Sequence, residues 1–350
     1  MKLATRCLPY GALPYESLDA ATRMQAKLFE QMPYLAFYPS LDEEDSIIKR
    51  TFTGIPGIKI KGQKVALKTT SNSYKQGLAK LDNAYTMPSE ATLEPFAIES
   101  PFMDKFLQIA KKFKSNFACV NLLGPFTISQ MLMNAAEEQT LADKSYRKLF
   151  IQAICVKALW AIYKIRSMSP KTTPIIILEE PTLAQLGVLK REMEDITDDL
   201  VINLLAKVIE KLQMAGALVA VQCMEKCNWQ VPIKAGADII SFDAYNNPNN
   251  MSIFPDDIIE FIKRGGKINW GIVPTMNESL VKGLTVDYMA QRLFATFEGL
   301  ILAGVSEPYV YNSAFVSVQG NLDHLPVIFA EKAVMIATQL AQRIPVKTLK

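Results

Sequence analysis

Three short apolar runs between Ala217 and Thr275 constrain the fold more than any other part of the sequence. They read LVAVQC, ADIISFD and KINWGIV. The first two end in Cys223 and Asp243, and the third ends at the Val273-Pro274-Thr275 corner. Short runs rich in Val and Ile, separated by helical or looped connections, are typical of parallel strands buried on both faces. The carboxyl ends of such strands meet at one rim, so we expect Cys223, Asp243 and the corner at residues 273–275 to point at one place.

The remainder of the chain repeats this alternation of short apolar runs and helical patterns. We predict eight strands, at Leu3, Leu35, Phe117, Ile175, Val219, Ile239, Ile268 and Tyr309. Eight alternating units favour an α/β fold of the (β/α)8 TIM-barrel type over an open doubly wound sheet. We therefore predict a single TIM-barrel domain over residues 1–350.

Residues 40–100 interrupt the alternation and are predicted to be an insertion after the second strand, lying over one barrel mouth. Gly54, Gly57 and Gly62 punctuate the stretch GIPGIKIKGQKVAL, in which apolar and basic residues alternate. This pattern indicates a β-hairpin near residues 52–68, followed by a less regular segment. An isolated hairpin is marginally stable in water, so the barrel body or a second subunit is expected to cover it.

Composition and charge exclude several classes of protein. A hydrophobic fraction of 49% with 21% charged residues supports a large core and argues against disorder. The net charge is only +3 and the cations are spread along the chain, so no nucleic-acid partner is expected. No secretory or membrane-spanning segment is recognisable, and five cysteines without a disulfide framework suit a reducing cytoplasm.

Several predicted strand ends resemble a known superfamily. They read LPYGALPYES, MPYLAFYPSL, GPFT at 124–127, EEP at 179–181, QCMEKCNW at 222–229, ISFDAY at 240–245 and GGKINWGIVPT at 265–275. These are similar to corners of the superfamily that joins the catalytic domain of cobalamin-independent methionine synthase to uroporphyrinogen decarboxylase and the corrinoid-linked methyltransferases. The resemblance implies a barrel whose methyltransferase branch holds zinc at the carboxyl rim, where the zinc lowers the pKa of a substrate thiol.

The zinc ligands of that branch are only partly present. The branch has a His and a Cys at the strand-five corner, a carboxylate after strand six and a second Cys after strand eight. In this sequence the His position holds Val221 or Gln222, Cys223 matches the first Cys and Asp243 matches the carboxylate. Ala314 stands about where the second Cys belongs.

A catalytic zinc needs three protein ligands, and an amide oxygen is a poor one. We therefore expect no zinc. If a metal binds, its ligands would be Cys223, Cys227 and Asp243, because Cys227 follows Cys223 by four residues and a turn could bring both thiols to one ion. The alternative is that the two cysteines pack as small apolar side chains.

Glu179 and Glu180 are the other candidates for chemistry, together with Cys223 and Asp243. Adjacent strand residues face opposite sides, so one glutamate should point into the barrel mouth, where burial would raise its pKa and make it an acid or base. The alternative is a structural carboxylate that accepts bonds from loop amides. The Gly124-Pro125 turn opens a helix whose free N–H groups could receive an anion. Candidate ligand contacts are Gln222, Asn121, Tyr245, Asn312 and Tyr10.

Three functions remain open at this point. The first is a methyltransferase-family barrel with a degenerate metal site, binding a small molecule at its carboxyl rim. The resemblance implies a methyl-folate or methyl-corrinoid donor, and a corrinoid protein as candidate partner. The second is a catalytically inactive binding or partner protein. The third is a metal-free decarboxylase-like enzyme, although Arg6 stands alone where uroporphyrinogen decarboxylase has an arginine-rich signature.

Overall fold

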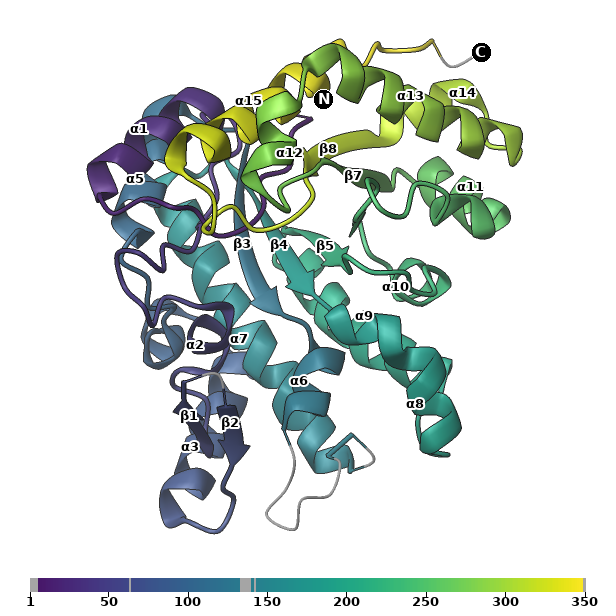
Figure 1. Ribbon diagram of the computed structural model, residues 1–350. Coiled ribbons are helices and arrows are strands. Elements are labelled where there is room, and N and C mark those ends of the chain that lie inside the picture. Colours follow the sequence, from purple (N-terminus) through teal and green to yellow (C-terminus); the bar gives the residue numbers. More distant parts are fainter. Residues whose placement is uncertain (1–5, 63, 133–139, 142, 349–350) are drawn as a thin grey trace.

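A curled six-stranded parallel sheet runs through the centre of the molecule (Figure 1). The structure, a computed structural model, describes residues 6–62, 64–132, 140–141 and 143–348. The strands lie in the order β3-β4-β5-β6-β7-β8, namely β3 (Phe117–Leu123), β4 (Thr173–Glu179), β5 (Leu218–Gln222), β6 (Ile239–Phe242), β7 (Lys267–Val273) and β8 (Ala314–Val318). The first five coincide with strands predicted from the sequence.

Two extended segments near the amino terminus complete the ring between β8 and β3. They pair through isolated parallel bridges, which join Cys7 to Val316, Ala12 to Phe37 and Tyr34 to Cys119. Prolines 9, 14, 33 and 39 interrupt these segments, and proline lacks the N–H group that a longer ladder needs. The TIM-barrel-like fold is thus confirmed, with the first two strand positions reduced to bridges. The predicted start of the first strand at Leu3 lies outside the described residues.

The predicted eighth strand at Tyr309 was wrong. Residues Glu307–Ser313 form helix α14, and β8 follows it at Ala314–Val318. Glu307 in the first turn and Pro308 beside it are signals for a helix start, whereas AFVSV carries the β-branched residues of a strand. The carboxyl corner of β8 is therefore at Gln319, and Ala314 lies at the opposite, amino end of this strand.

Helices cover the outer face of the sheet, as Figure 1 shows. Trp270 of β7 packs on Phe297 with ring centroids 5.2 Å apart, which identifies the helix-facing side. None of the described helices is long and apolar enough to cross a bilayer. Outside the insertion these helices are α1 (Leu18–Leu28), α5 (Met103–Phe113), α6 (Pro125–Met131), α7 (Lys144–Met168), η2 (Pro181–Gln185), α8 (Leu186–Glu192), α9 (Asp198–Met214), α10 (Gln230–Lys234), η3 (Met251–Ile253), α11 (Pro255–Lys263), α12 (Glu278–Gly283), α13 (Val286–Leu302), α14 and α15 (Val327–Arg343).

The insertion contains the predicted hairpin and more helix than the sequence suggested. The hairpin pairs β1 (Ile58–Lys61) with β2 (Lys64–Leu67) in antiparallel register. The segment expected to be less regular instead holds α3 (Asn72–Thr86), α4 (Glu90–Leu93) and η1 (Glu94–Phe96), and α2 (Ile47–Phe52) precedes the hairpin. Ser71 caps α3 by accepting from the Tyr74 N–H, and α3 packs along α7. This contact with a distant helix stabilises a segment whose own sequence signal is weak.

Candidate active site at the carboxyl rim

The inner face of the barrel carries a belt of polar side chains. Residues that pair in register on neighbouring parallel strands point to the same side of the sheet. The register places on the side opposite Trp270 the residues Asn121, Glu179, Gln222, Ser241, Asn269 and Ser317. Barrels of this type are usually filled there by branched apolar residues. A polar interior therefore indicates a role beyond packing.

Two amide oxygens in this belt are left without a partner. Asn269 Nδ2 donates to Ser241 Oγ at 2.8 Å and to Ser317 Oγ at 2.9 Å, while Asn121 Nδ2 donates to Glu179 Oε1 at 2.8 Å. The Oδ1 atoms of both asparagines are buried and meet no donor from the described residues. A buried acceptor without a donor costs about 1–3 kcal/mol. These oxygens are thus available to a ligand or to water.

Glu179 lies at the end of β4, where it is hydrogen-bonded to Asn121 and close enough to Tyr10 to interact with it electrostatically. Burial raises the pKa of the Glu179 carboxyl, and the Asn121 hydrogen bond and the Arg50 charge counteract part of the rise. The pKa of Tyr10 is raised by burial and further by the nearby Glu179 and Cys223. Three of the residues predicted from the sequence, Tyr10, Asn121 and Glu179, therefore come together at the rim.

Glu180 points the other way, into the neighbouring loop, as strand alternation predicts. Its buried carboxylate accepts from the Phe126 N–H at 2.9 Å, from the Thr127 N–H at 2.7 Å and from the Thr127 hydroxyl at 2.6 Å. Burial raises the pKa of Glu180 to about 7, although these three bonds oppose the rise. The free N–H groups at the start of α6, which could have received an anionic ligand, are thus occupied by the Glu180 carboxyl group. A Cβ on Gly124 would lie 2.2 Å from Glu180 Oε1, so this contact requires glycine.

Asp243, just after β6, is held by two side chains. Its Oδ1 accepts from the Asn246 N–H at 2.9 Å, and its Oδ2 accepts from Asn246 Nδ2 at 2.6 Å and Gln319 Nε2 at 2.9 Å. Gln319 was not predicted as a site residue because the eighth strand had been placed too early in the sequence. The signal was present, since the alternating run AFVSV ends at Gln319-Gly320.

Cys223 and Cys227 form a thiol pair beside β5. A hydrogen bond from the Cys227 thiol lowers the pKa of Cys223, whereas burial raises the pKa of Cys227. Cys223 Sγ also lies 3.7 Å from the Glu225 carbonyl oxygen. Cys227 lines a cavity of about 320 Å³ near the β4 and β5 corners.

The described residues do not fit the zinc that the family resemblance implies. No group of three or more His, Cys, Asp or Glu side chains among them is arranged to hold a metal ion. The Cys223 and Cys227 thiols are hydrogen-bonded to each other, and both oxygens of Asp243 already accept hydrogen bonds. No step through zinc is therefore assigned to this site.

Three other residues that were predicted to contact a ligand interact with other parts of the protein. The Arg292 guanidinium lies over the Tyr245 ring, 4.4 Å from the ring centroid. Arg292 also donates to the backbone carbonyl of Tyr245 at 3.1 Å. Gln222 is buried and donates to Met224 Sδ at 3.1 Å. The rim position predicted for Asn312 was wrong. Asn312 lies in α14 at the amino end of β8 and donates to the carbonyl of Lys347 at 2.7 Å.

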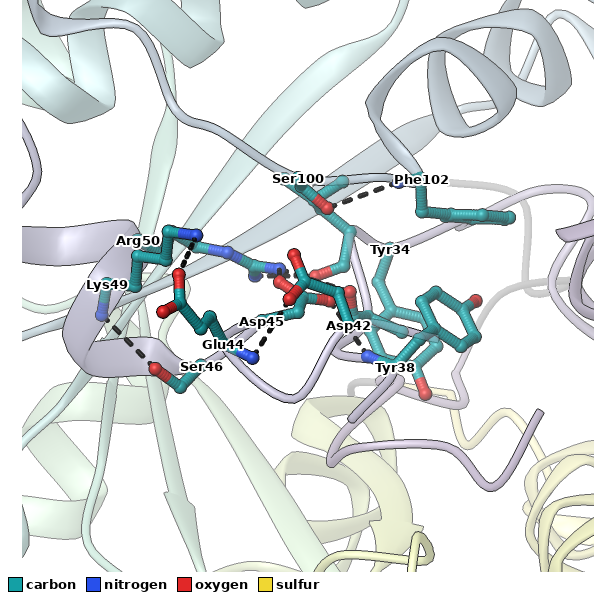
Figure 2. A network of polar contacts seen from close by, with 12 residues as sticks. Tyr34, Tyr38, Asp42, Glu44, Asp45, Ser46, Lys49, Arg50, Ser100 and Phe102 are labelled. Atoms are coloured by element: carbon teal, nitrogen blue, oxygen red, sulfur yellow. Dashed lines mark hydrogen bonds and ion pairs between the residues drawn. The ribbon is translucent and has the colours of Figure 1, made fainter. Parts of the chain in front are cut away.

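Arg50 is a buried cation that the sequence pattern did not single out. Its guanidinium donates to the carbonyls of Leu35 at 2.6 Å and Ala36 at 3.1 Å, and it lies 3.6 Å from the Phe37 ring centroid. Figure 2 shows the side chain beside Asp45. The Arg50 guanidinium lies 3.9 Å from Asp45 Oδ1. Burial lowers the pKa of Arg50 to about 10. The available signal was the pair of basic residues Lys49 and Arg50 in the short helix IIKRTF, of which Arg50 is the buried one.

Comparisons with known proteins find similarity only among solved structures. No protein-family model matches the chain, and no curated protein matches it. Similar solved structures include a B12-independent methionine synthase from Shewanella sp. W3-18-1, with 15% identity, coverage of 70% of this chain and 67% of that chain, and a TM-score of 0.45. A GH5 cellulase described as Bacteroidetes-affiliated has 9% identity, coverage of 92% and 94%, and a TM-score of 0.44. A chitobiase from Flavobacterium johnsoniae has 8% identity, coverage of 97% and 52%, and a TM-score of 0.35. Identities and TM-scores this low do not assign the chain to a family.

Proposed function

We propose that this chain is a methyltransferase-like barrel enzyme that binds a small polar molecule at the carboxyl rim and uses Glu179 as its acid–base group. One observation carries the proposal. A carboxyl whose pKa is raised by burial lies at the mouth of a polar barrel interior, bonded to Asn121 and next to Tyr10. Titratable groups perturbed in this way are concentrated at functional sites.

Glu179 has the properties that a proton acceptor needs. A raised pKa brings the carboxyl closer to the pKa of the group that it deprotonates, which favours general base catalysis near neutral pH. In methyl transfer, the substrate nucleophile would form a bond to the methyl carbon while the bond between that carbon and the donor breaks. The proton released by the nucleophile would pass to Glu179. The methyl group itself would come from the folate or corrinoid donor that the sequence resemblance implies.

The ligand should carry hydrogen-bond donors. The unpaired Oδ1 atoms of Asn121 and Asn269 accept hydrogen bonds only, and the second oxygen of Glu179 also accepts. An ammonium or hydroxyl group would satisfy them, so an amino acid is the class of small molecule that fits best. Homocysteine itself should be methylated weakly, because a thiol without zinc keeps a pKa of about 8.5 and little thiolate forms.

A thermal-shift panel of amino acids with thiol, hydroxyl and carboxyl side chains tests the binding step. At a concentration about 100-fold above its Kd, a ligand adds about 2.7 kcal/mol to the free energy of unfolding, which raises the midpoint by several degrees. We expect at least one amino acid to shift the wild type and to shift Glu179→Gln much less. The exposed Glu225→Gln serves as the matched control. A panel that leaves the wild-type midpoint unchanged argues against an amino-acid site.

Turnover then separates an enzyme from a binding protein. Each bound amino acid is incubated with methyl-tetrahydrofolate or methylcobalamin, and the methylated product is measured by mass spectrometry. Product formed by the wild type and reduced by about 100-fold or more in Glu179→Gln supports the base, since general base catalysis contributes about 10²–10⁴-fold. Binding without product from either donor would favour the catalytically inactive binding protein instead.

A further inference from the structure

A strongly basic segment lies within the insertion. Residues 51–80 contain six lysines and neither Asp nor Glu, so this segment carries +6 while the whole chain carries only +3. The remaining residues therefore sum to −3. Charge of one sign gathered in 30 consecutive residues creates a local field that attracts anions.

The fold wraps this segment around a cavity of about 600 Å³. Lys59 of β1, Lys68 after β2 and Lys80 of α3 line it. None of these lysines takes part in the ion pairs formed among the described residues. No Asp or Glu lines the cavity either. Three positive charges thus face one space without a carboxylate to neutralise them.

Hydroxyl groups and a closely approaching backbone complete the lining. Thr70, Ser71 and Ser73 contribute the hydroxyls. Ser71 Oγ accepts the Tyr74 N–H and shares a hydrogen bond of 2.8 Å with Ser73 Oγ, so one of these two hydroxyls keeps its proton to donate to a ligand. Gly57 has a φ of +78°, and a Cβ there would lie 2.7 Å from the Lys68 carbonyl oxygen. The wall of the cavity therefore depends on glycine at this turn.

The cavity lies on the same side of the molecule as the carboxyl rim. Asp82 of α3 contacts Lys148 and Gln152 of α7, each at 2.8 Å. Because α7 ends just before the amino end of β4, these early turns of α7 lie at the carboxyl end of the sheet. Figure 1 shows the hairpin and α3 beyond the end to which the β3 arrow points. A ligand in this cavity would be separate from the Glu179 site but on the same side of the barrel.

We propose that the lysine cavity binds the phosphate group of a small phosphorylated molecule. Phosphate carries more than one negative charge and several acceptor oxygens, which match three ammonium groups and adjacent hydroxyl donors. Lysine binds phosphate as a point charge, whereas planar carboxylates are recognised best by the two-pronged arginine guanidinium. The lining contains lysine and no arginine, so phosphate is the favoured anion.

Calorimetry with inorganic tripolyphosphate at low salt tests the site, with citrate as a polycarboxylate comparison. The triple variant Lys59→Gln, Lys68→Gln, Lys80→Gln removes the cavity lysines. A second variant, Lys61→Gln, Lys64→Gln, Lys75→Gln, removes the same charge from lysines of the segment that do not line the cavity. All six lysines are exposed, so both variants should fold, which circular dichroism checks.

We expect tripolyphosphate to bind the wild type and the control variant alike, and to bind the cavity variant at least about 100-fold more weakly, as charge-assisted hydrogen bonds are the strong ones. Equal losses in both variants would show a diffuse surface field and overturn the proposal. Citrate binding as tight as tripolyphosphate would overturn the assignment to phosphate. A single-stranded oligonucleotide that binds far more tightly than tripolyphosphate would identify a nucleic-acid surface instead.

Discussion

Replacing Glu180 by Gln should change how the stability of the protein depends on pH. The Glu180 carboxyl has a pKa of about 7 in the folded chain, against 4.5 for a glutamate carboxyl exposed to water. The folded state therefore holds this proton more firmly than the unfolded state does. The stabilisation is complete below the unfolded pKa and is lost as the pH rises through the folded pKa.

The size of the effect follows from these two values. Between pH 5 and pH 8 the wild type should lose about 2.5 kcal/mol of unfolding free energy through this one group. Gln has no titrating group, so Glu180→Gln escapes this loss. It instead carries a loss that does not vary with pH, of about 1–3 kcal/mol, because its NH2 group must face either the Phe126 N–H or the Thr127 N–H, while its amide oxygen accepts from the other.

The measurement is urea unfolding of the wild type, Glu180→Gln and the exposed control Glu225→Gln at pH 5, 6, 7 and 8. Subtracting the variant curve from the wild-type curve cancels every other titrating group, including Glu179. The unfolding free energy of the wild type minus that of Glu180→Gln should fall by about 2.5 kcal/mol from pH 5 to pH 8. A difference that instead grows with pH would show that the three hydrogen bonds outweigh burial and hold the carboxyl ionised. That result, or a difference independent of pH, would refute the reasoning.

Three further predictions concern Gly124, Arg50 and the zinc content of the protein. Gly124→Ala should destabilise the protein by at least about 2 kcal/mol in urea unfolding, since its Cβ would overlap Glu180 Oε1, and an unchanged midpoint would contradict this packing. Arg50→Lys should lower the free energy of unfolding by about 2–4 kcal/mol, because lysine cannot reach both backbone carbonyls while lying over the Phe37 ring. A loss below about 0.5 kcal/mol in urea unfolding would argue that the network in Figure 2 is dispensable. Protein purified without chelator should contain less than stoichiometric zinc by elemental analysis. Stoichiometric zinc that disappears in Cys223→Ser would restore a metal mechanism.

Features that depend on neighbouring residues in the sequence could be predicted from it. The Val- and Ile-rich runs located β3 to β7, and glycines among alternating residues located the β1–β2 hairpin. The opposite directions of Glu179 and Glu180 follow from the two-residue period of a strand, which needs no knowledge of the rest of the fold. Each of these signals lies within one short stretch of the sequence.

Features that depend on long-range contacts were decided by the tertiary structure. Helix α14 and strand β8 adjoin each other in sequence. The local signals at Glu307-Pro308 and in AFVSV favour this division, and the parallel pairing of β8 with β7 fixes where the strand begins. Gln319 reaches Asp243 across 76 residues, and Arg50 binds the carbonyls of an extended segment about 15 residues earlier. The unpaired oxygens of Asn121 and Asn269 likewise exist only because the barrel closes around them. Burial, which sets the pKa values of Glu179 and Glu180, is a property of the packed molecule and not of the local sequence.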